Sequence, residues 1–158
     1  MTDEKDLKHA KTVYSTLCAM LDENDWHYEK DEDNLTISCS ARGEDLPIMI
    51  QMEVDAKRHL VTLLSHLPFL VPENRRTALA VAVSQANNGM VDGSFDYDFN
   101  KGSIVFRMTS SYIDSLIGKE LLDYMVMCSC ATVDQYNDKF LIVAKSEMTN
   151  EEILMFIK

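Results

Sequence analysis

The stretch FDYDFNKGSIVFR, from Phe95 to Arg107, fits two different structures. Its acidic pattern from Asp96 to Asn100, D-x-D-x-N, matches the first three ligand positions of an EF-hand calcium loop. Such a loop needs glycine at its sixth position and a bidentate glutamate at its twelfth. Lys101 and Arg107 occupy these two positions. Because a cation stands where the strongest ligand should be, the pattern does not predict a calcium site.

The same stretch is typical of a β-hairpin. Phe95, Tyr97 and Phe99 alternate with two aspartates, so in a strand all three rings face the core and both carboxylates face water. The following Asn-Lys-Gly supplies residues that tolerate the positive φ angles of a tight turn. We therefore predict a hairpin here.

Strands are also predicted upstream, in a series of alternating apolar and polar residues. Residues 35–41 and 48–55 alternate with period two, residues 59–67 form a third run rich in Val, Leu and Thr, and residues 26–30 are a possible short strand. The connections are short and polar. Short connections between successive strands predict antiparallel neighbours, that is, a β-meander.

Four helices are predicted around these strands. Three- and four-residue spacing of apolar positions indicates helices at residues 5–21, 73–88 and 119–145, and a Thr149-Asn-Glu-Glu capping box begins a fourth. The first half of the 119–145 helix is apolar almost all round, which predicts burial on more than one side. We expect residues 1–158 to form a single α+β domain with helices packed on one face of an antiparallel sheet, and a short extra helix at residues 149–158.

The charge of the chain excludes one class of partner. The 158 residues include 26 acidic and 15 basic ones, giving a formal charge of −11, and no basic cluster is longer than Arg75-Arg76. Such a chain repels phosphate backbones, so we expect no nucleic-acid partner. We see no signal peptide and no apolar run of membrane-spanning length, so we expect no membrane partner and a cytoplasmic protein.

No catalytic, cofactor-binding or metal-binding residue is predicted. Cys128 and Cys130 resemble a C-x-C half-site, but side chains two apart on a helix point about 200° from each other, so we interpret both as core thiols in a helix buried on two sides. The remaining possibility is a small enzyme or ligand-binding protein whose pocket gathers His59, His66 and Asp114.

The chain resembles a known family in its second half. The runs NRRTALAVAVSQANNGMVDGSFDYDFNKGSIVFRMTSSY (Asn74–Tyr112) and LIGKELLDYMVMCSCATVDQYNDKFLIV (Leu116–Val143) resemble the YbjN family, described as bacterial sensory transduction regulators. The matching features are a helix ending in asparagines, a G-x-F-x-x-D hairpin and a V-D-Q-Y helix. The resemblance implies an α+β fold similar to class I type III secretion chaperones, and a non-enzymatic role in binding or regulation.

The expected function is therefore that of a regulatory module that binds another polypeptide through a sheet edge or an apolar groove. The long helix carries more apolar surface than one intramolecular face needs, so we expect a homodimer or partner contact at Tyr124, Met127 and Cys128. A dedicated chaperone for a secreted protein is the alternative. The sequence does not identify the partner, the regulated process or the binding surface.

Overall fold

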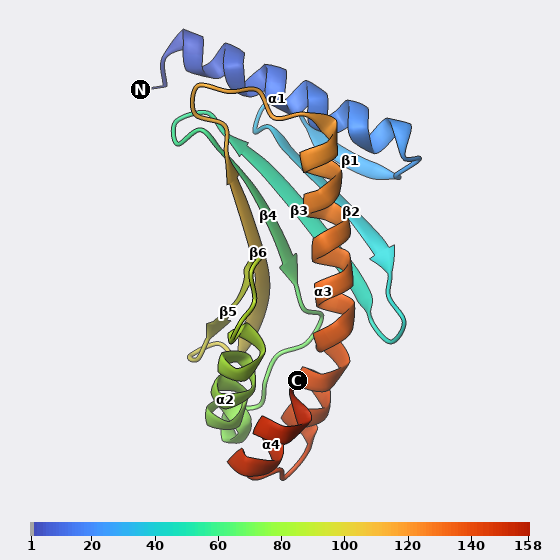
Figure 1. Cartoon of the computed structure of the whole chain (residues 1–158), viewed down its shortest axis with the longest axis vertical. Coiled ribbons are helices and arrows are strands. Elements are labelled where there is room, and N and C mark those ends of the chain that lie inside the picture. The colour runs from blue at the N-terminus through green and yellow to red at the C-terminus, as the bar shows by residue number, and fades with distance from the viewer. Residues whose placement is uncertain (1) are drawn as a thin grey trace.

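The computed structural model describes residues 2–158 and consists of one antiparallel sheet with helices (Figure 1). The helices are α1 (Glu4–Glu23), α2 (Arg76–Asn87), α3 (Lys119–Lys145) and α4 (Asn150–Phe156), and a short 3-10 turn, η1 (Glu73–Arg75), precedes α2. The strands are β1 (Tyr28–Asp31), β2 (Thr36–Arg42), β3 (Pro47–Asp55), β4 (Leu60–His66), β5 (Ser94–Asp98) and β6 (Ser103–Ser111). The predicted α+β class is confirmed.

All six strands form one sheet in the order β1-β2-β3-β4-β6-β5, and every neighbouring pair is antiparallel. The first four strands are the predicted meander. The later hairpin adds to it through β6, which pairs with β4 along seven residues. As a result β1 and β5 are the two edge strands. The possible strand at 26–30 begins two residues later than predicted, at Tyr28.

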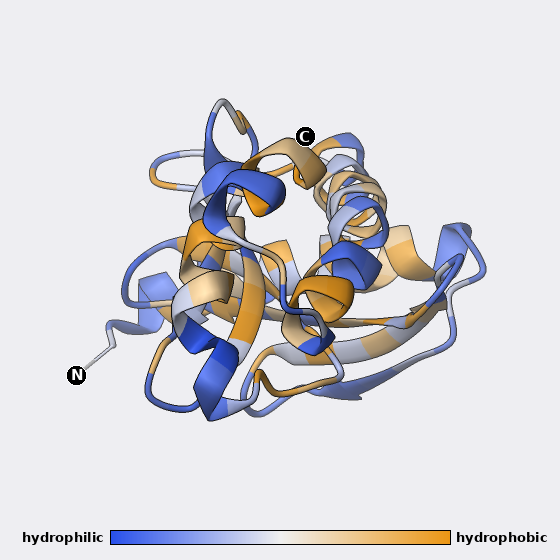
Figure 2. Cartoon of the chain, turned by 90° about the horizontal axis from the view of Figure 1, so that it is seen from below, coloured by the Kyte–Doolittle hydropathy of each residue, from blue (hydrophilic) through white to orange (hydrophobic). Residues whose placement is uncertain are grey.

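One face of the sheet is buried. Along β3, for example, Ile48, Ile50, Met52 and Val54 are buried, whereas the alternate residues Met49, Gln51 and Glu53 are exposed. In Figure 1, α3 runs along the length of the sheet, α1 crosses one end, and α2 and α4 lie at the other end. Figure 2 shows hydrophobic and hydrophilic residues alternating along strands and helices, as expected for elements with one buried side.

The hairpin β5–β6 is confirmed, with one correction. Phe95 is buried and packs edge-to-face on Phe106 and Phe140, at centroid distances of 5.2 and 5.0 Å. Tyr97 is half-buried and its hydroxyl donates to the Arg76 carbonyl (2.8 Å). The prediction that all three rings face the core is wrong for Phe99, which lies in the turn beyond β5 and is half exposed.

Both aspartates of the hairpin bond to other residues of the same hairpin. Asp96 pairs with Arg107 across the ladder, at 2.6 and 3.1 Å. Asp98 accepts the backbone N–H groups of Asn100 and Lys101, both at 3.0 Å, and so fixes the turn. The side chains that suggested calcium ligands therefore hold the strand pair together. No group of His, Cys, Asp or Glu residues between residues 2 and 158 is arranged to hold a metal ion.

The long helix α3 is buried on one side, not on two as predicted. Its inner side packs on the sheet through Leu122, Met125, Val126, Val133 and Phe140, all buried. On the outer side no further layer covers the helix, so Tyr124 and Met127 are each about half exposed. The thiols Cys128 and Cys130 are correspondingly half-buried rather than part of the core.

The end of α3 is fixed by the first residue of the Arg75-Arg76 pair. The Arg75 guanidinium donates to the carbonyl of Val143 (3.2 Å) in the last turn of α3, which also accepts from Ser146, and to that of Met148 (3.3 Å) in the connection to α4. Arg76 holds the β5–β6 turn through the carbonyls of Val71 and Asn100. The only adjacent arginines of the chain are therefore internal connectors.

The predicted capping box is present at the start of α4. The Thr149 hydroxyl accepts the Glu152 N–H (3.3 Å), and the Glu152 carboxylate accepts the Thr149 N–H (2.9 Å). Ile153 and Ile157 anchor this segment in the core. The helix packs on α2, so the C-terminal segment covers the lower end of the helical layer.

Candidate interaction surfaces

The outer side of α3 carries a contiguous series of exposed and half-buried apolar residues. Leu121, Tyr124, Cys128 and Ala131 recur at spacings of three and four, and Met127 lies beside them. We call these five residues the α3 surface. A three-four repeat places all of them on one side of a helix, opposite the side that packs on the sheet. The three predicted contact residues Tyr124, Met127 and Cys128 are thus brought together.

Tyr124 links this surface to the loop between α2 and β5. Its hydroxyl donates to the Asp92 carboxylate, and this hydrogen bond and the adjacent negative charge raise the pKa of the phenol to about 12. The neighbouring Val91 is 92% exposed, the most exposed large apolar residue of the described chain. The loop thereby extends the apolar area of the α3 surface toward β5.

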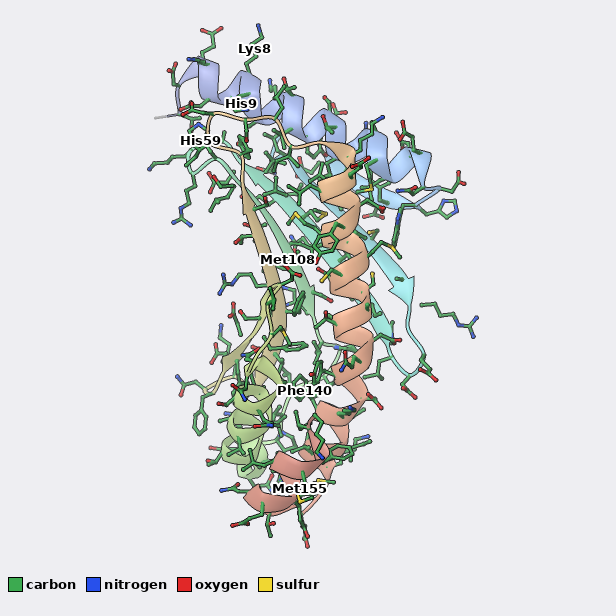
Figure 3. All side chains as sticks on the ribbon, in the orientation of Figure 1. Lys8, His9, His59, Met108, Phe140 and Met155 are labelled. Atoms are coloured by element: carbon green, nitrogen blue, oxygen red, sulfur yellow. The ribbon has the colours of Figure 1, made fainter. Side chains whose placement is uncertain are left out.

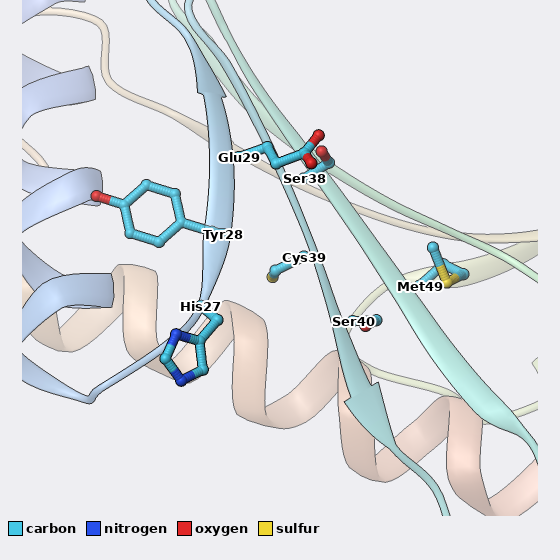
Figure 4. A pocket seen from close by; sticks show the side chains of 7 residues that line it. All are labelled: His27, Tyr28, Glu29, Ser38, Cys39, Ser40 and Met49. Carbon is cyan, nitrogen blue, oxygen red and sulfur yellow. The ribbon is translucent and has the colours of Figure 1, made fainter.

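A second candidate lies at the β1 edge. A depression of about 450 Å³ is lined by His27, Tyr28, Glu29, Ser38, Cys39, Ser40 and Met49 (Figure 4). It lies beside the start of β1, because the first residue of β1, Tyr28, pairs with Cys39 while β2 runs on to Arg42. Burial raises the pKa of the Cys39 thiol to about 11, so this thiol is a poor nucleophile near neutral pH. The depression therefore offers space without an activated group.

A third candidate lies at the opposite edge, between α2 and β5. This groove has a volume of about 600 Å³ and is lined by Ala80, Val83, Ser84, Gln85, Asn87, Asn88, Phe95 and Tyr97. None of these side chains is charged. A groove between a helix and an edge strand is one of the places where proteins bind extended segments.

Two histidines meet at the junction of α1 with the ends of the strands (Figure 3). His59 contacts the Asp6 carboxylate (3.0 Å), and His9 contacts the Ser115 carbonyl (2.6 Å). Both rings pack edge-to-face on the buried Tyr112, at centroid distances of 5.6 and 4.9 Å. The cluster joins α1 to the loop before α3.

The predicted alternative site, a pocket that gathers His59, His66 and Asp114, is not formed. His59 precedes β4 at one end of the sheet and His66 ends the same strand at the other. Asp114 adopts a left-handed backbone conformation (φ 51°) in the loop after β6. None of the depressions described above is lined by these three residues.

The sequence model of the YbjN family matches residues 14–141, which is most of the chain. The chain belongs to the YbjN family. The family is described as a putative bacterial sensory transduction regulator. The match spans the meander, the hairpin and nearly all of α3, so the family shares the elements that form the sheet and its long helix.

The fold of this YbjN member is also found in a solved structure. The crystal structure of YbjN from E. coli, described as a putative transcription regulator, superposes with a TM-score of 0.58 at 12% sequence identity. The superposition covers 79% of this chain and 88% of that chain. No curated protein matches the sequence. At this identity the similarity establishes the fold.

Two features of the interaction surfaces were not predicted from the sequence. The sequence places Asn87 only at the end of a helix, whereas its side chain hydrogen-bonds the backbone of Phe95. The His9–His59–Tyr112 cluster joins residues up to 103 positions apart, so only the tertiary structure reveals it.

In the described part of the chain, residues 2–158, no helix has both the length and the apolar character needed to cross a membrane.

Proposed function

We propose that this YbjN member is a regulatory module of the bacterial cytoplasm that acts by binding polypeptides, and that the α3 surface is its principal contact and forms a homodimer. The observation that carries the proposal is the exposure of the α3 surface. Tyr124 and Met127 expose 49% and 55% of their area, and Val91 beside them 92%. Contiguous exposed apolar area of this kind is typical of protein–protein contacts.

The shape of the α3 surface favours self-association. Large residues, Leu121, Tyr124 and Met127, are followed by the small residues Cys128 and Ala131. Two such helices that pack antiparallel, with the twofold axis between Met127 and Cys128, place Met127 of each copy opposite Cys128 of the other and Tyr124 opposite Ala131. A contact related by a twofold axis needs this kind of self-complementary surface.

The absence of a predicted catalytic motif and the regulatory description of the family support a binding role. The formal charge of −11 indicates basic rather than nucleic-acid partners, because like charge repels a phosphate backbone.

Sedimentation velocity of the full chain over a wide concentration range tests the contact. Met127→Asp should shift the protein from dimer to monomer, because a carboxylate cannot be buried there without a partner. Met155→Asp is the matched control, since Met155 is a methionine of greater exposure (71%) on α4, far from the α3 surface. A wild-type protein that stays monomeric at high concentration refutes the dimer.

Affinity capture from a bacterial cytoplasm followed by mass spectrometry tests the regulatory role. We expect wild type and Met155→Asp to retain a common polypeptide that Met127→Asp loses. If all three proteins capture the same set, the α3 surface is not the contact.

A further inference from the structure

The edge strand β5 has one residue whose backbone groups point away from the sheet and are unoccupied. In an antiparallel ladder, opposed residues alternate between pairs that bond each other and pairs that do not. The Ile104 carbonyl accepts the Leu67 N–H (3.0 Å) on the far side of β6, so the groups of Ile104 face β4. Its partner Tyr97 therefore directs its own N–H and C=O outward.

The other outward-facing residue of β5 is already bonded. The Asn87 side chain accepts the Phe95 N–H (2.8 Å) and donates to the Phe95 C=O (2.9 Å). This carboxamide occupies both backbone groups, as a residue of a neighbouring strand would. Within residues 2–158 no such partner bonds the outward N–H and C=O of Tyr97. The edge of the sheet is therefore hydrogen-bonded at Phe95 and free to pair at Tyr97, and we call these two positions closed and open.

The open position faces the groove between α2 and β5. Opposite Tyr97 the helix presents Ala80 and Ser84, whose small side chains leave the volume of about 600 Å³ unfilled. The floor and wall are uncharged, while Asp96 and Asp98 project on the other face of the strand. An added strand would thus meet small, uncharged residues on one side and carboxylates on the other.

We propose that the groove between α2 and β5 binds an extended basic segment of a partner protein, which pairs antiparallel to β5 through Tyr97. The segment places a small apolar side chain opposite Tyr97, toward Ala80 and Ser84, and lysine or arginine next to it, toward Asp98, whose carboxylate is bonded only to backbone N–H groups, whereas Asp96 already pairs with Arg107. This assignment rests on the proposed role in polypeptide binding and adds a second site to the α3 surface.

Charge excludes a second copy of the chain as the occupant. In a twofold pairing centred on Tyr97, Asp96 of each copy would lie opposite Asp98 of the other. Four carboxylates and two Arg107 guanidinium groups would then gather on one face; the net charge there is negative, and like charges directly opposite each other destabilise a strand pair. A basic segment reverses the sign of this interaction, and the overall charge of −11 favours its approach.

The test uses a fluorescein-labelled hexapeptide, KVKVKV, and the full-length chain, with anisotropy as the readout. One valine takes the position that bonds Tyr97, and the lysines on each side of it face Asp98 and the Asp96–Arg107 pair. N-methylation of the valines should weaken binding at least tenfold, whereas N-methylation of the lysines should change it less than threefold, because the lysine N–H groups point away from β5. The peptide EVEVEV, with the same alternation and opposite charge, should bind at least tenfold more weakly.

The variant Ser84→Trp fills the groove from an exposed position of α2 and should reduce peptide affinity at least tenfold. Thr12→Trp, at an exposed position of α1, is the matched control and should leave it unchanged. In amide hydrogen exchange, the peptide should slow the Tyr97 amide at least tenfold and leave the Asp96 amide, already bonded within the ladder, unaffected. Equal sensitivity to the two N-methylated peptides, or an unprotected Tyr97 amide, overturns the proposal.

The failures of the two proposals are distinguishable. If Ser84→Trp abolishes a dimer measured by sedimentation, a second copy occupies the groove and the basic-segment assignment is wrong. If KVKVKV binds as described while Met127→Asp changes neither the oligomeric state nor the captured polypeptides, the groove stands and the α3 surface is refuted. If the captured polypeptides depend on Met127 but the peptide does not bind, only the groove is refuted.

Discussion

Replacing Asn87 by alanine should destabilise the protein by removing the bonds that close β5 at Phe95. The carboxamide makes two hydrogen bonds to the Phe95 backbone, of 2.8 and 2.9 Å, and is the only described partner of these outward groups. The Phe95 ring is 3% exposed and packs on Phe106 and Phe140, so loosening this residue disturbs the core directly.

The size of the effect follows from these contacts. Two hydrogen bonds contribute together about 2 kcal/mol. Alanine recovers roughly 0.5 kcal/mol through its higher helix propensity, so the net loss should be about 1.5 kcal/mol. For a chain of 158 residues this corresponds to a decrease in Tm of about 3–6 °C. Asn87→Asp should cost at least as much, because a carboxylate accepts the Phe95 N–H but repels its carbonyl.

Urea unfolding followed by circular dichroism measures the free energy, and hydrogen exchange measures the Phe95 amide. Asn88→Ala is the control, since this neighbouring side chain is exposed and makes no described hydrogen bond, and it should stay within about 0.5 kcal/mol of wild type. An Asn87→Asp protein as stable as wild type, or a Phe95 amide equally protected in Asn87→Ala, would refute the role of the carboxamide.

Three further predictions concern the core and its ends. Arg75→Ala should cost about 2 kcal/mol, because it removes the two hydrogen bonds by which the guanidinium joins the end of α3 at Val143 to the connection to α4 at Met148, and should raise hydrogen exchange in α4 first, as mass spectrometry would show. Burial raises the pKa of Tyr112 to about 12. Because the folded state therefore holds the phenol proton more tightly than the unfolded chain, the stabilisation is complete below pH 10 and is lost as the pH rises from 10 to 12. In alkaline unfolding curves, Tyr112→Phe should remove part of that decline in stability. Burial also raises the pKa of Cys39 and Cys130 to about 11, so at pH 8 iodoacetamide should alkylate both far more slowly in the folded than in the unfolded chain, as peptide mapping can determine.

Local patterns were sufficient to predict the elements of this fold. Period-two alternation located β2 and β3 to within a few residues, and the capping box located α4, since each depends on neighbours in the sequence. The order of the strands depends on a different kind of information. Insertion of β6 beside β4 joins residues 39 to 51 positions apart, and the alternation of one strand does not specify its partner.

The prediction for α3 was wrong for an identifiable physical reason. Apolar residues nearly all round its first half predict burial on two sides, but the buried residues of α3 form a single stripe, which packs on the sheet and on α1 and α2. Tyr124 and Met127 consequently face outward. Hydrophobic residues predict that a helix surface is buried. They do not show whether another element of the same chain or a second chain buries it. The three contact residues therefore remain a prediction that depends on the state of assembly.

The two edges of the sheet are protected to different degrees. Charged residues occupy three consecutive positions of the four-residue edge strand β1, Glu29, Lys30 and Asp31, a common protection against unwanted strand pairing. β5 relies instead on α2 beside it and on one side chain, Asn87, which closes Phe95 and leaves Tyr97, two residues on, unpaired. If protection were the only requirement, a second amide opposite Tyr97, at Ser84 or Ala80, would complete it. The small residues found there leave a groove of about 600 Å³ beside the edge, which suits a single extended segment.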